Sequence, residues 1–160
     1  MAIARLTEFL DAHKVAYVVV SHSPAYTAQG IAALTHIPGK EMAKTVIVKL
    51  NDKLAMVVLP AKFHVDLAAL KSEAHAETAV LASEDDFRDF FPECETGAMP
   101  PFGNLFGVPV FADENLEKDS GIAFNAGTHR ELIRMTWTDF KRLAEPTMIR
   151  LAMGHSAEAA

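Results

Sequence analysis

The segment that decides the fold is Ala43-Lys44-Thr45-Val46-Ile47-Val48-Lys49-Leu50-Asn51-Asp52-Lys53-Leu54-Ala55-Met56-Val57-Val58-Leu59-Pro60. Two apolar runs, 43–50 and 53–60, flank the dipeptide Asn51-Asp52. Asn and Asp tolerate the positive φ that a two-residue hairpin turn requires. The segment therefore predicts an antiparallel β-hairpin.

Outside this hairpin, short helical and extended patterns alternate along the chain. Apolar spacing, Ser and Thr caps, and Pro and Gly breaks predict helices over residues 3–13, 27–34, 66–74 and 138–144, and one that is capped by Ser83 and stops before Pro92. Further strands are predicted over residues 17–20, 78–81, 108–112, 121–125 and 132–137. This alternation predicts a single mixed α/β (α+β) domain over residues 1–150. The weakly patterned residues 151–160 predict a frayed tail.

Composition limits the possible functions. The 160 residues are 50% hydrophobic and carry a formal net charge of −6, which argues against broad, non-specific binding of nucleic acid. No apolar run approaches the ~20 residues of a membrane span, and we identify no signal peptide, so we expect a cytoplasmic protein. Cys94 is the single cysteine and cannot form an internal disulfide.

A stiff loop is predicted at Gly97-Ala98-Met99-Pro100-Pro101-Phe102-Gly103. The adjacent prolines fix φ and lack an N–H, so backbone donors are left on Gly97, Ala98 and Met99. Such donors can hold a carbonyl oxygen, an oxyanion or a carboxylate. The alternative is a tight structural corner, because Gly and Pro dominate ordinary turns.

Two further residues are candidates for chemistry. Lys44 opens the first hairpin strand and can bind a phosphate or polarise an ester carbonyl, although a solvated lysine at a strand end is the simpler interpretation. His129 lies in Asn125-Ala126-Gly127-Thr128-His129, a predicted turn between two strands. It could donate a hydrogen bond, contact a nucleotide or shuttle a proton, or be an exposed turn residue. Asn125 and Thr128 could add polar contacts.

Other hydrolytic chemistries lack their residue patterns. The seven histidines are scattered, with no H-x-H or H-E-x-x-H, which disfavours a metal hydrolase. Cys94 has no histidine beside it in sequence, and no G-x-S-x-G elbow is present.

Three motifs, taken together, resemble the YbaK/prolyl-tRNA synthetase-associated editing domain family. They are Ala43-Lys44-Thr45-Val46-Ile47-Val48-Lys49, the G-x-x-x-P loop from Gly97 to Pro101, and the segment from Asn125 to His129, in the family's order over roughly residues 3–147. The resemblance implies a domain built on a curved mixed β-sheet surrounded by helices. It also implies a free-standing aminoacyl-tRNA deacylase that acts on the 3′ aminoacyl end of mischarged tRNA. We expect this enzyme to use no cofactor and no metal. An aminoacyl-tRNA synthetase is a possible partner.

The resemblance also suggests roles for residues. It implies that Lys44, Gly97 and His129 form the catalytic set, with Lys44 holding the tRNA end. Substrate binding is expected from the loop and from the turn, namely Ala98, Met99, Pro100, Pro101, Asn125 and Thr128. Pro100 departs from several relatives, which carry a hydroxyl-bearing residue there.

An aminoacyl ester is already activated, so the site needs only to place a water and stabilise the developing oxyanion. We expect donors at residues 97–99 to stabilise the oxyanion. The resemblance implies that a vicinal ribose hydroxyl helps to orient the water. A pocket closed by Met99, Pro100 and Pro101 would admit a small residue such as alanine, cysteine, serine or threonine. The alternative is a non-catalytic tRNA- or synthetase-binding module of the same fold.

Overall fold

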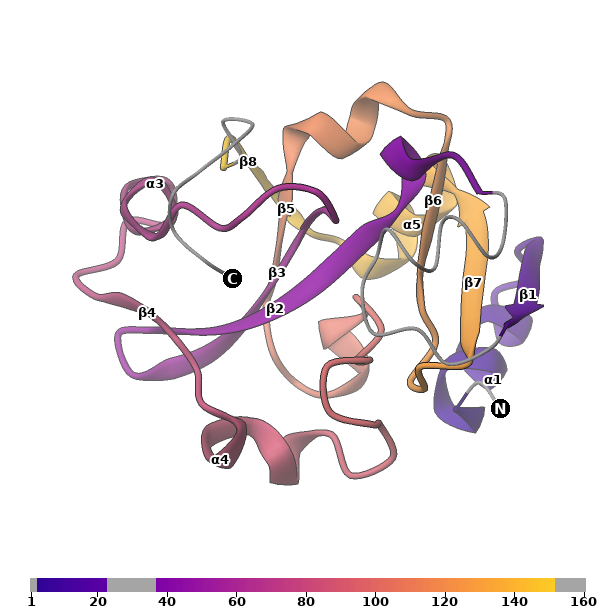
Figure 1. The fold of residues 1–160 in the computed structure, drawn as a ribbon, viewed down its shortest axis with the longest axis horizontal. Helices are drawn as coiled ribbons and strands as arrows, with labels where there is room; N and C mark the ends of the chain where they lie inside the picture. Colours follow the sequence, from indigo (N-terminus) through magenta and orange to yellow (C-terminus); the bar gives the residue numbers. More distant parts are fainter. Residues whose placement is uncertain (1–2, 23–36, 152–160) are drawn as a thin grey trace.

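The computed structural model describes residues 3–22 and 37–151, which form two β-sheets with helices packed around them (Figure 1). The larger sheet has the strand order β4-β2-β3-β5-β8, and the smaller has the order β1-β7-β6. The strands are β1 (Tyr17–Ser21), β2 (Ala43–Leu50), β3 (Lys53–Pro60), β4 (Ala79–Leu81), β5 (Val110–Asp113), β6 (Gly121–Asn125), β7 (Glu131–Thr136) and β8 (Thr147–Ile149). The helices are α1 (Ala4–Ala12), α3 (Leu67–Glu73), α4 (Glu84–Phe87) and α5 (Trp137–Ala144), with 3-10 turns η1 (Gly39–Glu41), η2 (Arg88–Phe90), η3 (Gly103–Leu105) and η4 (Glu114–Lys118). The predicted mixed α/β class is confirmed.

The β2–β3 hairpin is confirmed with the predicted bounds. Its register runs from Ala43 opposite Pro60 to Leu50 opposite Lys53. Asn51 and Asp52 have φ of 51° and 65°, as a two-residue turn requires. The Asn51 side-chain oxygen also accepts hydrogen bonds from the backbone N–H groups of Glu77 and Thr78, at 2.8 and 3.2 Å. Asn51 thereby ties the turn to the start of β4.

The two sheets meet near the beginning of β2. A parallel bridge joins Met42, just before β2, to Ala123 of β6. β5 pairs in parallel with β3 and with β8, and every other named pair is antiparallel, so the larger sheet is mixed. The strands expected to form one curved sheet thus fall into two sheets joined at this bridge.

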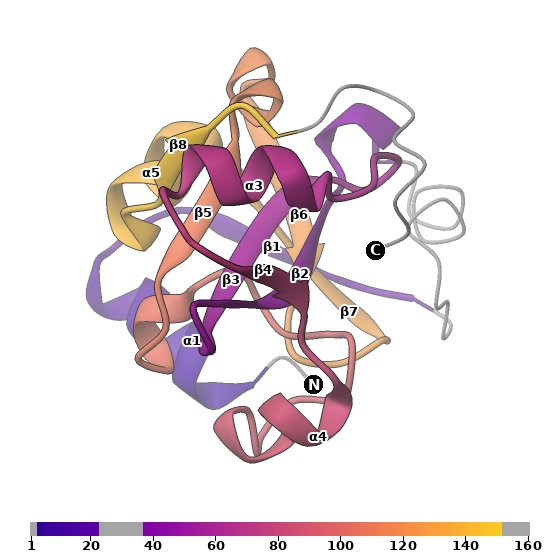
Figure 2. The same ribbon diagram turned by 90° about the vertical axis from the view of Figure 1, so that its left-hand side faces the viewer.

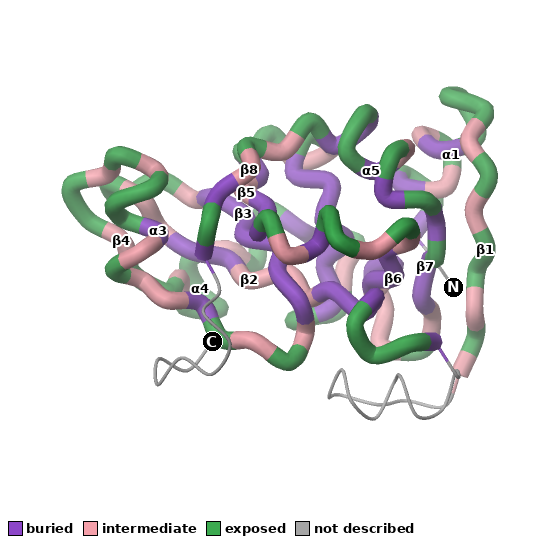
Figure 3. The backbone as a smooth tube through the Cα atoms, turned by 90° about the horizontal axis from the view of Figure 1, so that it is seen from above, coloured by how far each residue is buried: buried purple, intermediate pink, exposed green. Residues whose placement is uncertain are grey.

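Successive residues of β2 face two different cores. Ala43 and Ile47 belong to the main core, which is shared with helices α1 and α5 and contains the buried Phe102 and Phe124. Val48 faces the opposite way, into a second cluster with buried residues of β3 and α3. Figure 2 shows α3 crossing the face of the larger sheet that carries the second cluster. Figure 3 shows where buried residues lie along the central strands. Successive side chains of a strand point to opposite faces of the sheet, which explains why β2 contributes to both cores.

The ends of several elements differ from those predicted. Helix α5 begins at Trp137, because the side chain of Thr136, and not that of Thr138, accepts the Asp139 N–H at 3.2 Å. Ser83 caps α4 as predicted, but this helix is only four residues long and η2 follows it. Strand β8 was not predicted, and it pairs with β5.

The predicted helix over 27–34 lies outside the described residues, as do residues 152–160, so the frayed tail stays a prediction. Leu151, placed at the start of that tail, is buried, and its N–H donates to Asp113 Oδ1 at 3.2 Å.

Over residues 3–22 and 37–151, no helix has the length and apolar character needed to cross a membrane.

Candidate active site

Gly97 lies in a tight turn that its lack of a side chain makes possible. Its φ is +85°, in the left-handed region that other residues adopt only with strain. The Ala98 N–H donates to the Glu95 carbonyl at 3.0 Å and closes the turn. The prediction that the Ala98 N–H stabilises an oxyanion is therefore wrong, because this N–H already donates to the Glu95 carbonyl. The N–H groups of Gly97 and Met99 donate to no acceptor within the described part of the chain.

This turn is held against the segment that carries His129, and we call the paired segments 95–98 and 127–129 the loop clamp. The Glu95 N–H donates to the Gly127 carbonyl at 2.8 Å, and the Gly127 N–H donates to the Ala98 carbonyl at 2.9 Å. The His129 N–H donates to Glu95 Oε1 at 2.6 Å. Gly97 and His129, distant in sequence, are thus brought together.

One nitrogen of the His129 ring also takes part in the loop clamp. His129 Nε2 lies 2.8 Å from the Thr96 carbonyl oxygen, and because a carbonyl only accepts, Nε2 carries the proton. A Cβ on Gly97 would lie 3.6 Å from His129 Cε1. His129 Nε2 therefore holds the turn in place, and it is not the atom that would shuttle a proton.

Lys44 lies near the beginning of β2, opposite Leu59 of β3. Its side chain is half-buried, and this burial lowers the pKa of its ammonium group. A charge in such a partly desolvated position interacts more strongly with a nearby anion than an exposed charge does. By the two-residue period Lys44 faces the same way as Met42.

Asn125 lies at the end of β6, and the two-residue period along β2 and β6 indicates that it faces the same way as Lys44. Met42 and Ala123 form the parallel bridge, and Lys44 and Asn125 each follow two residues later. The Asn125 side-chain oxygen is buried and has no hydrogen-bond partner among residues 3–22 and 37–151. A buried acceptor without a partner is costly, so this amide oxygen is a candidate to bind a ligand donor.

Gly97 and His129 meet in the loop clamp, and Lys44 lies on a different element, β2. The segment that begins at Asn125 is tied to residues 95–98 by the hydrogen bonds of the loop clamp. Glu95, whose carboxylate fixes the backbone of His129, was not predicted, and no local pattern in the sequence indicates it.

The remaining residues predicted to bind substrate lie in the interior or within a turn. Met99, Pro100 and Pro101 are buried, and Met99 packs in the main core. The hydroxyl oxygen of Thr128 accepts a hydrogen bond from the Arg130 N–H at 3.2 Å, inside its own turn. Met99 is thus part of the core, and Thr128 is part of the loop clamp.

Cys94 lies close to the loop clamp in sequence and is half-buried. Burial and the neighbouring Glu93 carboxylate raise the pKa of its thiol to about 11, against a smaller opposing effect of Arg5. The thiol is therefore protonated at neutral pH and is a poor nucleophile.

Within the described residues, no three His, Cys, Asp or Glu side chains are grouped to hold a metal ion.

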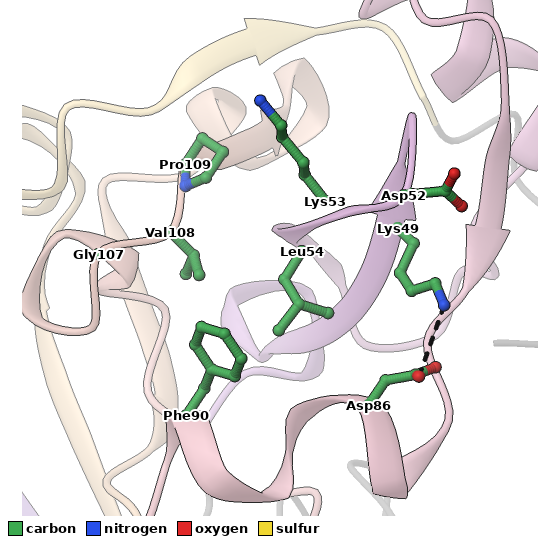
Figure 4. Close-up of a pocket in the computed structure, with 9 residues that line it drawn as sticks. All are labelled: Lys49, Asp52, Lys53, Leu54, Asp86, Phe90, Gly107, Val108 and Pro109. Atoms are coloured by element: carbon green, nitrogen blue, oxygen red, sulfur yellow. Dashed lines mark hydrogen bonds and ion pairs between the residues drawn. The ribbon is translucent and has the colours of Figure 1, made fainter.

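A cavity of about 530 Å³ lies at the turn end of the hairpin, far along β2 from Lys44 (Figure 4). Its apolar floor includes Leu54, Phe90 and Val108. Lys49, on its rim, forms an ion pair with Asp86 at 3.5 Å. None of the predicted site residues lines this cavity.

Comparison with known proteins gives two relatives whose names refer to tRNA. The chain is 27% identical over 150 residues to the multifunctional Ser/Thr-tRNA deacylase ProXp-y of Escherichia coli, covering 91% of this chain and 89% of that protein. It is 28% identical over 138 residues to the proline–tRNA ligase of Leuconostoc mesenteroides, covering 84% of this chain and 24% of the ligase.

Solved structures give the same fold. A crystal structure described as a candidate trans-editing enzyme for prolyl tRNA synthetase superposes with a TM-score of 0.81 at 20% identity, covering 94% of this chain and 96% of that one. The family model of the aminoacyl-tRNA editing domain matches residues 22–143, which include Lys44, the G-x-x-x-P loop and His129. The chain therefore belongs to the aminoacyl-tRNA editing domain family.

Proposed function

We propose that this protein hydrolyses, in trans, the ester bond between a small mischarged amino acid and its tRNA. The observation that carries the proposal is the match of the editing-domain model across residues 22–143. The relative from Escherichia coli, which is similar over nearly its whole length, is named a Ser/Thr-tRNA deacylase. We place the activity in the cytoplasm, with mischarged tRNA as the partner and a synthetase as a possible second partner.

In this proposal, Lys44 binds the terminal phosphate or ribose of the tRNA. The partial burial that lowers its pKa also strengthens its attraction to a phosphate. The buried oxygen of Asn125, on the same face, accepts a hydrogen bond from the amino group or a hydroxyl of the substrate. These two contacts orient the ester so that the reacting atoms meet in a productive geometry.

The reaction itself needs no protein nucleophile. Water attacks the ester carbonyl, the carbon–oxygen bond to the ribose breaks, and the ribose oxygen takes up a proton. A vicinal ribose hydroxyl orients the water. The N–H of Gly97, which has no acceptor among the described residues, stabilises the oxyanion, and His129 keeps Gly97 in position through the loop clamp.

The test is a deacylation assay with purified protein and a panel of tRNAs charged with serine, threonine, alanine or cysteine. We expect release of at least one of these amino acids well above the buffer rate, with no loss in EDTA. Release at the buffer rate for the whole panel would favour the non-catalytic binding module. Strong inhibition by EDTA that zinc reverses would favour a metal hydrolase.

A further inference from the structure

A second cavity, of about 390 Å³, collects three lysines in a chain whose formal net charge is −6. Lys40 comes from η1, Lys62 from the segment after β3, and Lys118 from η4. We call this set the lysine pocket. The short helical segments of 39–41 and 114–118, purple and orange in Figure 1, both lie at the upper edge of the molecule.

The positive charge of the lysine pocket is only partly balanced. Lys40 pairs with Asp119 at 3.5 Å, and this carboxylate also lines the pocket. Within the described part of the chain, Lys62 and Lys118 form no ion pair with a carboxylate. Ammonium groups that line one pocket repel one another, so an anionic ligand would lower the electrostatic free energy there.

The lysine pocket lies beside the strand end that carries Lys44. Pro60, which lines the pocket, pairs with Ala43, the residue before Lys44. The Ala61 N–H donates to the Met42 carbonyl at 2.9 Å, which fixes the segment leading to Lys62 against the start of β2. Phe63 adds a half-buried aromatic wall, with Lys62 Nζ 5.4 Å from its ring centroid.

We propose that the lysine pocket binds the phosphate backbone of the tRNA acceptor end, beside the site that holds the ester. The proposal rests on the proposed function, which brings a tRNA terminus to Lys44. An RNA strand presents successive phosphates, each with a negative charge. The lysine pocket has two ammonium groups that form no ion pair with a carboxylate of the described residues. Its charge therefore fits an RNA backbone better than it fits a neutral ligand. The pocket would thus give affinity for the RNA, while the Lys44 site acts on the ester.

The test measures RNA binding without any reaction. The probe is an uncharged acceptor-stem hairpin with a single-stranded CCA end and a 5′ fluorophore, titrated by anisotropy at several KCl concentrations. The variant is Lys62→Ala/Lys118→Ala. The matched control is Lys53→Ala/Lys71→Ala, which removes the same charge from exposed lysines outside the lysine pocket.

We expect the pocket variant to bind the hairpin about tenfold more weakly and to flatten the slope of log affinity against log salt by roughly 1.4–1.8, since each lost phosphate contact accounts for about 0.7–0.9. The control should change neither quantity. Thermal unfolding of both variants checks that they fold. An affinity and slope equal to those of the wild type in the pocket variant would overturn the proposal.

A small-anion site is distinguished by a second measurement. If inorganic phosphate raises the Tm of the wild type but not that of the pocket variant, while RNA binding is equal in both, the pocket binds a free anion and the RNA assignment is wrong. Deacylation is assayed separately. Lysine-dependent RNA binding without deacylation would overturn the enzymatic proposal alone and leave the RNA surface standing.

Discussion

Lys44 combines a charge with partial burial, and that combination has a consequence for pH. Burial lowers the pKa of its ammonium group below the usual 10.5. The folded protein therefore loses this charge at a lower pH than an exposed lysine does. The phosphate binding that we propose for Lys44 requires the charged form.

We predict that kcat/KM for mischarged tRNA declines on the alkaline side at a pH below 10.5. Lys44→Arg should move this decline to higher pH, because arginine stays protonated. The measurement is a pH–rate profile corrected for spontaneous ester hydrolysis at each pH. An identical alkaline limb in the wild type and Lys44→Arg would show that Lys44 does not control it.

Cys94 has the opposite kind of shift, since burial and Glu93 raise the pKa of its thiol from 9.0 to about 11. At pH 8 the thiolate population is then about a hundredfold smaller than for an ordinary thiol. The folded state retains the proton, so this group's contribution to stability is present below pH 9.0 and is lost as the pH rises toward about 11.

We predict slow alkylation of Cys94 by iodoacetamide at pH 8 in the folded protein and fast alkylation in urea, measured by mass spectrometry. Cys94→Ala should keep its deacylase activity, because the proposed reaction uses no thiol. Abolished hydrolysis in a folded Cys94→Ala variant would overturn the substrate-assisted scheme.

At the scale of elements, the loop clamp depends on a left-handed glycine. Gly97→Val forces a branched residue to φ +85° and directs its side chain toward His129, whose Cε1 would be 3.6 Å from the new Cβ. Gly107 is a matched control: its φ is +74°, and among the described residues, its own chain neighbours aside, no atom lies within 4 Å of the position that a Cβ would take. Gly107→Val carries the same backbone strain, about 1–2 kcal/mol, without the contact.

We predict that both variants lower Tm but that only Gly97→Val lowers kcat/KM, by about tenfold or more as the loop clamp is displaced. Steady-state kinetics and thermal unfolding of the two proteins give the comparison. Equal kinetics in a folded Gly97→Val variant and the wild type would mean that the turn is only a structural corner.

The elements that could be predicted are those whose signals are local. The hairpin at 43–60 follows from a period of two and an Asn-Asp turn, and the structure confirms it. Strand β8 depends on pairing with β5, far away in sequence, so its own three residues carry no adequate signal. Thr136 and Thr138 are both possible caps, and only the hydrogen bond to the Asp139 N–H decides between them.

In the candidate site, too, features with a local signal could be predicted, and features that depend on distant residues could not. Lys44, Gly97 and His129 could be chosen from the sequence because their motifs occur in the family's order. The Glu95 carboxylate that fixes His129 could not, because its partner is 34 residues away and is reached only in the folded chain. The Ala98 N–H was wrongly predicted to be available to an oxyanion, because the sequence does not reveal that it closes a turn by donating to Glu95.

At the scale of the whole molecule, two sheets joined by the Met42–Ala123 bridge organise the candidate surfaces. Lys44 and Asn125 follow this bridge along their two strands, and the lysine pocket lies at the neighbouring strand end. The proposed ester site and the proposed RNA surface therefore share one end of the hairpin. The cavity in Figure 4 lies at the other end.

The decisive measurement is single-turnover deacylation of the best mischarged tRNA by the wild type and by Lys44→Ala. We predict that the wild type releases the amino acid well above the buffer rate and that Lys44→Ala, equally folded by circular dichroism, is slower by about a hundredfold or more. Release by Lys44→Ala at the wild-type rate would contradict the assignment of the ester site to this end of the hairpin.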